Sequence, residues 1–215
     1  IAKTDKFVVF DNINSPQGKS WLTRNRILLD EKQFWMTVPV YKGKAIPIRE
    51  LKIADGFTSK RKHLGALKSA YKKANHFPEL FPQIENVYQK TFTSVAEFNM
   101  ELVQLVMRLL CLKPTLVWAS ELMTPEETRG LKGNAMVLEL ARRAGATTYI
   151  SGTGCKDFIL PEEFEKSGIE FIFNEVSHPK YRQSGNSQAF VTDLSIIDLL
   201  FNLGPSRLNK LLRAS

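Results

Sequence analysis

The sequence predicts an α/β fold in which a mostly parallel sheet is flanked by helices, with a β-hairpin and helical insert in the N-terminal half. Two observations lead to this expectation. Residues 115–203 alternate apolar strand segments with helical segments at the lengths of βαβ units. Residues 12–55 instead carry short apolar stretches between turn-forming residues, which is typical of hairpins and loops. We therefore expect a single domain over residues 1–215 that accommodates an insert at residues 12–113.

The composition is that of a globular protein. The chain has 215 residues, of which 43% are hydrophobic and 24% are charged, and this is enough for one sizeable core. No apolar run reaches about 18 residues, so we expect no membrane span, and the two widely separated cysteines indicate neither a metal site nor a disulfide framework. A reducing cytoplasm fits this pattern. The chain begins at Ile1 without an initiator methionine, which predicts that an upstream segment has been lost.

The net charge is +8, from 30 Lys and Arg residues against 22 Asp and Glu residues. Such a balance is compatible with nucleic acid, an anionic membrane surface or a phosphorylated substrate, and also with plain solubility. The densest group of positive residues lies between Lys60 and Lys73, where we expect the solvated face of a helix. The sequence contains no helix-turn-helix, RNP, zinc or P-loop pattern.

The N-terminal half begins with a strand. Phe7–Phe10 is a continuous apolar run, which predicts a buried strand that ends at Asp11. Phe34–Val40 predicts a second strand, at an edge or ending early because of Pro39, and Ile46–Ile53 predicts a further short one. The helical spacing of apolar residues then predicts helices over 59–74, 82–91 and 94–112.

The second half is expected to build parallel strands with right-handed crossovers. Because parallel strands present their carboxyl ends at one edge of a sheet, we expect Asp11, Glu121 and the loop Ser151–Asp157 to lie together there. The expected elements are, in order, strand 115–119, helix 133–144, strand 147–150, helix 161–166, strand 169–176 and helix 195–203.

The loop after the strand at 147–150 is rich in small residues, with the sequence Ser151-Gly152-Thr153-Gly154-Cys155-Lys156-Asp157. Small residues at the carboxyl end of a strand allow backbone N–H groups to approach a phosphate or a carboxylate. The alternative interpretation is that the two glycines only form a tight turn.

Two other segments place chemically useful side chains close together. Trp21 is followed by Arg24, Asn25 and Arg26, and the two arginines share a face if this segment is extended. Paired guanidinium groups suit a phosphate or carboxylate, although a surface hairpin with paired arginines explains the pattern equally well. His63 falls on the apolar stripe of the helix at 59–74, where it is either a hydrogen-bonded core residue or a catalyst.

Seven blocks, in order along the chain, have the pattern of a known family. They are Asp5-x-Phe7-Val8-x-Phe10-Asp11, Trp21-x-x-Arg24-Asn25-Arg26-Ile27, Trp35-x-Thr37-Val38-Pro39-Val40, Lys62-His63-Leu64, Ala146-Thr147-x-Tyr149-Ile150-Ser151-Gly152, His178-Pro179-x-Tyr181-x-Gln183 and Leu194-Ser195-Ile196-Ile197-Asp198-Leu199-Leu200-Phe201-Asn202-Leu203-Gly204. Together they resemble the WbqC-like family over residues 5–204.

The resemblance implies a role beyond what the residues alone indicate. The family is bacterial and archaeal and often occurs among genes for O-antigen and other surface polysaccharides, where glycine or other acyl transfer to an amino sugar has been suggested. Its usual first strand, which carries Gln-Pro, is absent here. The family also often has a second carboxylate where Asn12 stands and glycine where Cys155 stands, which argues against Cys155 as a nucleophile.

Three functional hypotheses follow. The first, which we favour, is an acyl- or aminoacyl-transferase that acts on a nucleotide-linked amino sugar, with His63 or His178 as the base, oriented by Asp11 or Asp157. The second is an ATP-dependent nucleotidyl or carboxylate-activating transferase, and the third is a basic nucleic-acid or partner-binding domain without catalysis. The sequence indicates no particular cofactor. The expected substrate-binding residues are Trp21, Arg24, Asn25, Arg26, Ser151, Gly152, Thr153, Gly154, Tyr181, Gln183 and Asn202.

Overall fold

The structure, a computed structural model, describes residues 1–41, 43–54, 58–175, 179–186 and 189–214. The chain divides into two compact units, which are described separately. Unit 1 contains residues 1–12 and 113–177, and unit 2 contains residues 13–112 and 178–215. The expectation of a single domain concerns how these units associate, and it stays a prediction.

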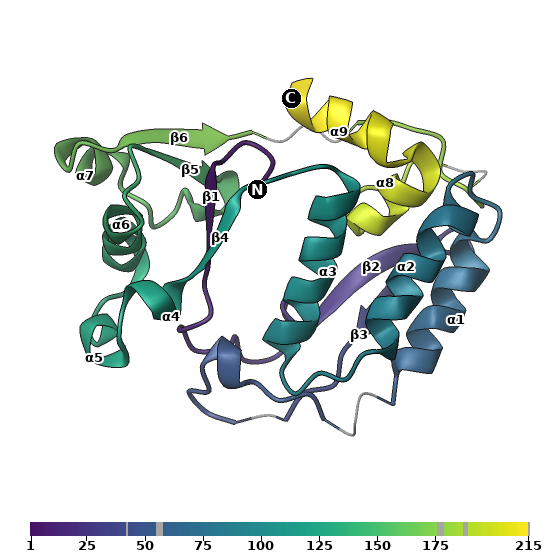
Figure 1. Cartoon of the computed structure of the whole chain (residues 1–215), viewed down its shortest axis with the longest axis horizontal. Helices are drawn as coiled ribbons and strands as arrows, with labels where there is room; N and C mark the ends of the chain where they lie inside the picture. Colours follow the sequence, from purple (N-terminus) through teal and green to yellow (C-terminus); the bar gives the residue numbers. More distant parts are fainter. Residues whose placement is uncertain (42, 55–57, 176–178, 187–188, 215) are drawn as a thin grey trace. The chain divides into compact units, whose positions relative to one another are not determined.

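Unit 1 is built on two pairs of parallel strands (Figure 1). β1 (Lys6–Val9) pairs with β4 (Thr115–Trp118), and β5 (Thr148–Gly152) pairs with β6 (Glu170–Asn174). The helices of this unit are α4 (Ala119–Leu122), α5 (Pro125–Thr128), α6 (Gly133–Arg143) and α7 (Pro161–Lys166).

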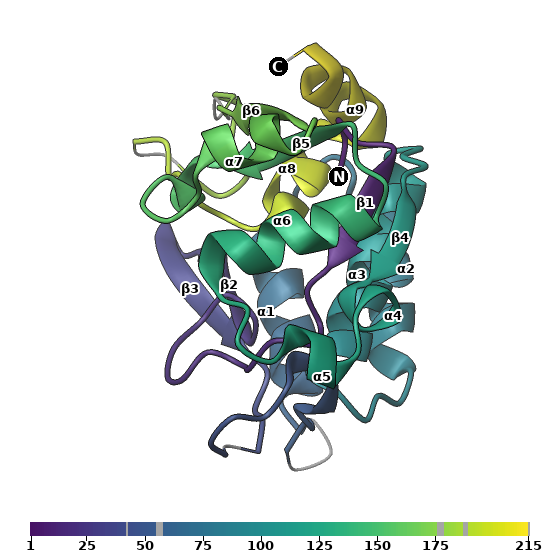
Figure 2. The same ribbon diagram turned by 90° about the vertical axis from the view of Figure 1, so that its left-hand side faces the viewer.

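Helix α6 separates two small cores of unit 1. Both Figure 1 and Figure 2 show it between the β5–β6 pair and the short helices α4 and α5. Met136 and Leu140 pack with Ala119 on one side, whereas Ala141 packs with Phe164 on the other. The 3.6-residue period of α6 therefore supplies an apolar residue to each core.

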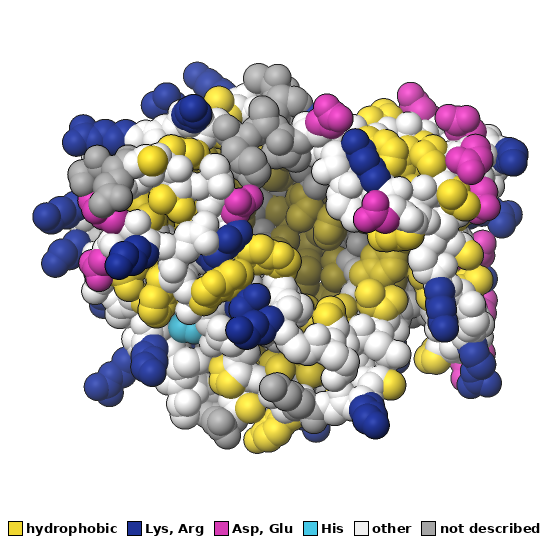
Figure 3. Space-filling model, turned by 180° about the vertical axis from the view of Figure 1, so that it is seen from behind, with side chains coloured by type: hydrophobic (Ala, Val, Ile, Leu, Met, Phe, Trp, Pro, Cys, Tyr) yellow, Lys and Arg dark blue, Asp and Glu magenta, His cyan; other side chains and the backbone are white. Residues whose placement is uncertain are grey.

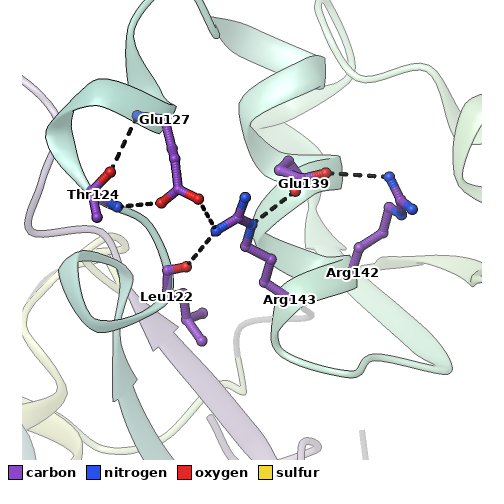
Figure 4. A network of polar contacts seen from close by, with 6 residues as sticks. All are labelled: Leu122, Thr124, Glu127, Glu139, Arg142 and Arg143. Carbon is purple, nitrogen blue, oxygen red and sulfur yellow. Dashed lines mark hydrogen bonds and ion pairs between the residues drawn. The ribbon is translucent and has the colours of Figure 1, made fainter.

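An ion-pair network joins α5 to α6 in unit 1 (Figure 4). The Arg143 guanidinium donates to Glu127 Oε1 at 2.8 Å, to Glu139 Oε1 at 2.8 Å and to the Leu122 carbonyl at 3.0 Å. The backbone N–H of Thr124, aided by the Arg143 guanidinium and the Thr124 hydroxyl, lowers the pKa of Glu127 to about 2. The network is solvent-exposed, so we assign it a structural role in fixing the first turns after β4.

Unit 2 packs helices against an antiparallel hairpin. β2 (Arg24–Leu29) pairs with β3 (Lys32–Thr37), and helices α1, α2 and α3 cover one face of this hairpin (Figure 1). Its core joins Ile27 of β2 and Met36 of β3 to buried helix residues such as Leu67 and Phe201. The helices of unit 2 are α1 (Lys60–Tyr71), α2 (Phe77–Gln89), α3 (Val95–Leu109), α8 (Ile196–Leu203) and α9 (Pro205–Ala214).

The α/β class is confirmed, but the expected sheet is not continuous. In the described part of the chain the strands form three two-stranded sheets, two parallel and one antiparallel. The strand expected at Ile46–Ile53 is wrong. A 3₁₀ helix (Ile48–Glu50) occupies its centre, and Val40 meets Ile53 only in an isolated bridge. Pro47 lacks an N–H and fixes φ, which favours a turn over a ladder here.

Two helix boundaries also differ from expectation, and proline explains both. The sequence predicts the second helix over residues 82–91, yet α2 already begins at Phe77, with Pro78 in its first turn. Likewise, the last predicted helix ends at residue 203, yet Pro205 begins a further helix, α9. Proline is favoured in a first helical turn because its missing N–H has no intrahelical partner there.

No helix in the described residues has both the length and the apolar character that crossing a membrane requires.

Candidate functional site

The open face of the β2–β3 hairpin carries two tryptophans and two arginines, which we call the Trp–Arg cluster (Trp21, Arg24, Arg26 and Trp35). Arg26 lies opposite Trp35 in the strand register, and Arg24 is two residues away on the same face. Figure 3, which views the molecule from behind, shows hydrophobic side chains beside Lys and Arg side chains on this face. The expectation that the two arginines share a face is confirmed.

The cluster is held by stacking. The Arg24 guanidinium carbon lies 3.9 Å from the centre of the Trp35 ring, and that of Arg26 lies 4.9 Å from Trp21 and 5.1 Å from Trp35. The two indole rings are 5.3 Å apart. Each cation–π contact stabilises the arrangement by about 0.5–1 kcal/mol at an exposed site.

The two arginines differ in their polar partners. Arg26 donates to Gln33 Oε1 at 2.8 Å and lies 4.0 Å from the Asp193 carboxylate. Arg24 makes no hydrogen bond or ion pair with any residue that the structure describes, and its Nε is shielded from water. Trp21 is 61% exposed, so the stack stays open on one side. Arg24 therefore presents a stacked guanidinium with no acceptor among the residues that the structure describes.

A second group of polar residues centres on Asp198, which is fully buried in α8. Tyr181 donates a short hydrogen bond to Asp198 Oδ2. Burial raises the pKa of Asp198, and donors from Tyr181, Tyr71 and Gln183 oppose that rise. The Tyr71 hydroxyl in turn accepts from Leu28 N at 3.2 Å. Asp198 thus ties α1, α8 and strand β2 to the segment that contains Tyr181.

His63 lies in the core of unit 2, with a 5% exposed fraction. Its Nε2 is 3.0 Å from the Thr37 carbonyl, and its Nδ1 is 3.3 Å from the Tyr88 hydroxyl. A carbonyl only accepts, so Nε2 carries the proton and Nδ1 accepts from Tyr88. Burial lowers the pKa of His63, against the smaller effect of the Thr37 carbonyl. These contacts favour the core interpretation of His63, and its catalytic role stays a prediction.

In unit 1, Asp11 follows β1 and joins the end of this strand to α4 by hydrogen bonds to Ser120. Its Oδ1 accepts from Ser120 N at 2.9 Å, and its Oδ2 accepts from Ser120 Oγ at 2.6 Å. Glu121 accepts from Trp118 N at 3.2 Å, a bond local to the first turn of α4, so it is Ser120 that joins the end of β4 to Asp11. Within the described residues, no hydrogen bond joins Asp11 to the loop Ser151–Asp157.

The glycine-rich loop of unit 1 begins with a buried serine and continues into solvent. Ser151 is 2% exposed, whereas Gly152, Thr153, Gly154 and Asp157 are exposed. Neither glycine has a positive φ, and a Cβ added to either would meet no atom within 4 Å. Thr153–Cys155 form a 3₁₀ turn, but neither backbone conformation nor crowding requires glycine at these two positions, so both interpretations of the loop stay open.

The chain matches a known protein family over most of its length. The model of the WbqC-like protein family matches residues 1–210. The chain belongs to the WbqC-like family. It is 30% identical over 210 residues to the uncharacterized protein Rv1507c of Mycobacterium tuberculosis (strain ATCC 25618 / H37Rv), an alignment that covers 95% of this chain and 86% of the relative. No solved structure matches the chain.

The residues that carried the WbqC-like resemblance fall into both units. Unit 2 contains Trp21, Arg24, Asn25, Arg26, His63, Tyr181, Gln183 and Asn202, and unit 1 contains Asp11, Ser151, Gly152, Thr153, Gly154 and Asp157. His178 lies outside the described residues.

Within unit 2 the other residues of the resemblance have contacts of their own, away from the side chains of the Trp–Arg cluster. Asn25 lies between the two arginines on β2, so its side chain is on the opposite face of the strand, and its Oδ1 accepts from Arg26 N at 2.8 Å. Gln183 is buried, and Asn202 uses its amide to bond the Asp198 carbonyl and Ser184 N, both at 2.8 Å. Among the described residues, no group of three His, Cys, Asp or Glu side chains has the arrangement of a metal site.

Sequence reasoning missed three residues that shape this part of unit 2: Trp35 and Gln33 beside the two arginines, and the buried Asp198 of α8. Trp35 and Asp198 each lie within a block that resembles the family, but neither was named as a site residue. An acidic residue among apolar neighbours in Ile196–Leu203 was the signal that it is buried with polar partners.

Proposed function

We propose that this WbqC-like protein is an acyl- or aminoacyl-transferase of surface-polysaccharide biosynthesis that binds a nucleotide-linked amino sugar at the Trp–Arg cluster. The observation that carries the proposal is Arg24, whose guanidinium is stacked on Trp35 and has no acceptor among the described residues. A charge held in place without a partner favours an anionic ligand. The family's association with polysaccharide genes supports an amino sugar as the other part of this anionic ligand.

The chemistry of the cluster fits both ends of such a ligand. The Arg24 and Arg26 side chains offer planar donor sets that match phosphate oxygens, and charge-assisted bonds of this kind are about twice as strong as neutral ones. The exposed face of Trp21 offers a stacking surface for a base or a sugar ring. Asp193 neutralises part of the Arg26 charge, so we assign Arg24 the larger share of the affinity.

The proposed reaction forms one bond and breaks another. The sugar nitrogen attacks the acyl carbon of a thioester or an acyl phosphate, the C–N bond forms, and the bond from that carbon to the leaving group breaks. The nitrogen loses its proton to a base. Asp11 and His63 already have their acceptor atoms engaged. Of the two histidines expected as the base, this leaves His178, which lies outside the described residues.

Isothermal titration with UDP-glucosamine and with UDP tests the binding step. Arg24→Met should raise the Kd of both ligands by about tenfold or more, because a charge-assisted bond contributes about 1.5–3 kcal/mol. Arg61→Met is the matched control, since Arg61 is an exposed arginine of α1 outside the cluster. Equal affinities for wild type and Arg24→Met, or no binding at all, would contradict the proposal.

A second experiment tests transfer. Wild type is incubated with UDP-glucosamine and acetyl-CoA or glycyl phosphate, and the nucleotide sugar is analysed by mass spectrometry. We expect the mass of the acylated sugar with one donor and not without protein. A sugar that binds but never gains mass would identify the cluster as a binding site without transferase activity.

A further inference from the structure

Residues 181–186 and 189–195 of unit 2 lie against the β2–β3 hairpin as a loop, which we call the Gln183 loop. Gln183 closes it from inside: its Nε2 donates to Val191 O at 2.8 Å, and its Oε1 accepts from Val191 N at 2.9 Å and from Asn186 Nδ2 at 3.0 Å. The amide is 4% exposed and uses both of its ends. The side-chain amide therefore pairs with the backbone N–H and C=O of Val191 as a neighbouring peptide group would, and this fixes the position of Val191.

The Gln183 loop reaches the Trp–Arg cluster through the residues that follow Val191. The Thr192 carbonyl accepts from Gln33 Nε2 at 3.1 Å, and Gln33 Oε1 accepts from Arg26 Nη1 at 2.8 Å. Ser195 N donates to the Arg26 carbonyl at 2.7 Å. Arg26 is thus held by the loop at its backbone and, through Gln33, at its guanidinium.

The other end of the loop is anchored to α8. Tyr181 donates to Asp198, and Ser184 N donates to Asn202 Oδ1 at 2.8 Å. A loop fixed at α8 and at the hairpin can set the orientation of an arginine that otherwise has several rotamers. Fixing a side chain before the ligand arrives lowers the entropy that binding costs.

We propose that Gln183 is a positioning residue, not a ligand contact: by clamping Val191 it holds Gln33, and through Gln33 it orients Arg26 on Trp21 and Trp35. The sequence leads us to expect that the side chain of Gln183 binds substrate directly; the proposal gives it this other role because its amide is buried and bonded to Val191 and Asn186. The inference rests on the proposed function for its ligand, but its geometric part concerns the unliganded protein.

Circular dichroism tests the geometric part without any ligand. Two indoles 5.3 Å apart give an exciton couplet, which is obtained as the spectrum of wild type minus that of Trp21→Phe. Gln183→Met, which keeps the size of the side chain and removes its polar atoms, should reduce the couplet by about half or more as Arg26 and the rings reorient. Gln83→Met is the matched control, because Gln83 is an exposed glutamine of α2.

Gln33→Met tests the far end of the same path. Gln33 is exposed on β3, so its loss leaves the core intact while it removes the bonds to Thr192 and Arg26. We expect the same loss of couplet as in Gln183→Met. A full couplet in folded Gln183→Met, or in Gln33→Met if Gln183→Met does not fold, would overturn the positioning role.

UDP titration then separates this inference from the proposed function. Both variants should raise the Kd of UDP by about threefold, less than Arg24→Met does, because Arg26 keeps its charge and loses only its preorganisation. An unchanged Kd in variants that lose the couplet would show that Gln183 orients the rings but does not serve ligand binding, which overturns the inference. If wild type does not bind UDP, the proposed function fails, and the couplet alone decides whether Gln183 positions Arg26.

Discussion

His63 illustrates how a titratable side chain can be held in one form by its neighbours. The Thr37 carbonyl requires a proton on Nε2, the Tyr88 hydroxyl occupies Nδ1, and burial opposes a second proton. The lowered pKa means that the unfolded chain, with a histidine pKa near 6.5, binds a proton that the folded chain excludes. The contribution of His63 to the free energy of unfolding is thus fully present above that pH, and it falls as the pH drops toward the pKa of the folded state.

We predict that His63→Gln flattens the acid side of the stability profile. Urea unfolding at pH values between about 7.5 and about 5 gives the free energy of unfolding as a function of pH. In wild type His63 should add at most about 1.4 kcal/mol per pH unit to the slope of this curve, and the slope should be smaller in the variant. Asp198 has a raised pKa and acts in the opposite direction, but it is present in both proteins. Identical slopes would show that folding does not lower the pKa of His63.

Residue patterns predicted part of the site for a physical reason. That Arg24 and Arg26 share a face follows from the alternation of side chains along any strand. What they stack on does not, because Trp35 arrives from the other strand of the hairpin. Gln183 shows the same limit: its polarity suggested a ligand contact, whereas only the fold reveals that Val191 and Asn186 engage its amide.

At the scale of elements, strands and helices with strong apolar periods were predicted well, and unusual turns were not. The β2–β3 hairpin turns at Asp30-Glu31, both with positive φ (50° and 60°). That conformation favours Asn-Gly or Asp-Gly, so Glu31 gave no turn signal. The prediction of a continuous sheet was wrong for another reason. Periodicity indicates that a segment is a strand, but it does not indicate which strands pair.

The junction between α8 and α9 depends on glycine. Gly204 has a φ of 77°, and a Cβ there would lie 2.5 Å from His76 Cε1 and 2.6 Å from His76 Nε2. We predict that Gly204→Ala lowers the free energy of unfolding by at least about 2 kcal/mol, since backbone strain of this kind costs about 1–3 kcal/mol before any clash. Thermal and urea unfolding would measure the loss.

Two further variants divide that loss into strain and clash. Gly185 has a φ of 76° but its added Cβ would approach nothing closer than 3.9 Å, so Gly185→Ala reports strain alone and should cost less. Adding His76→Ala to Gly204→Ala should recover part of the difference. Equal costs for the two glycine variants would mean that the His76 ring swings aside freely.

At the scale of the whole molecule, the net charge of +8 attracts polyanions in general, and exposed tryptophan beside arginine is also a surface that stacks single-stranded nucleic acid. Specific binding of UDP and general binding of a polynucleotide differ in the number of phosphates neutralised. Salt dependence measures that number, because each neutralised phosphate releases counterions.

We therefore predict different salt responses for UDP and for a short oligouridylate, measured by titration at about 50 and about 200 mM salt. Two phosphates held by the cluster should cost UDP about sevenfold in affinity, whereas four phosphate contacts would cost an oligonucleotide about fiftyfold. Trp21→Ala should weaken UDP and leave the charge-driven part of oligonucleotide binding unchanged. An oligonucleotide that binds more tightly than UDP at the higher salt, and that loses its affinity in Trp21→Ala, would instead make the Trp–Arg cluster a nucleic-acid site, because stacking and not charge would then carry the interaction.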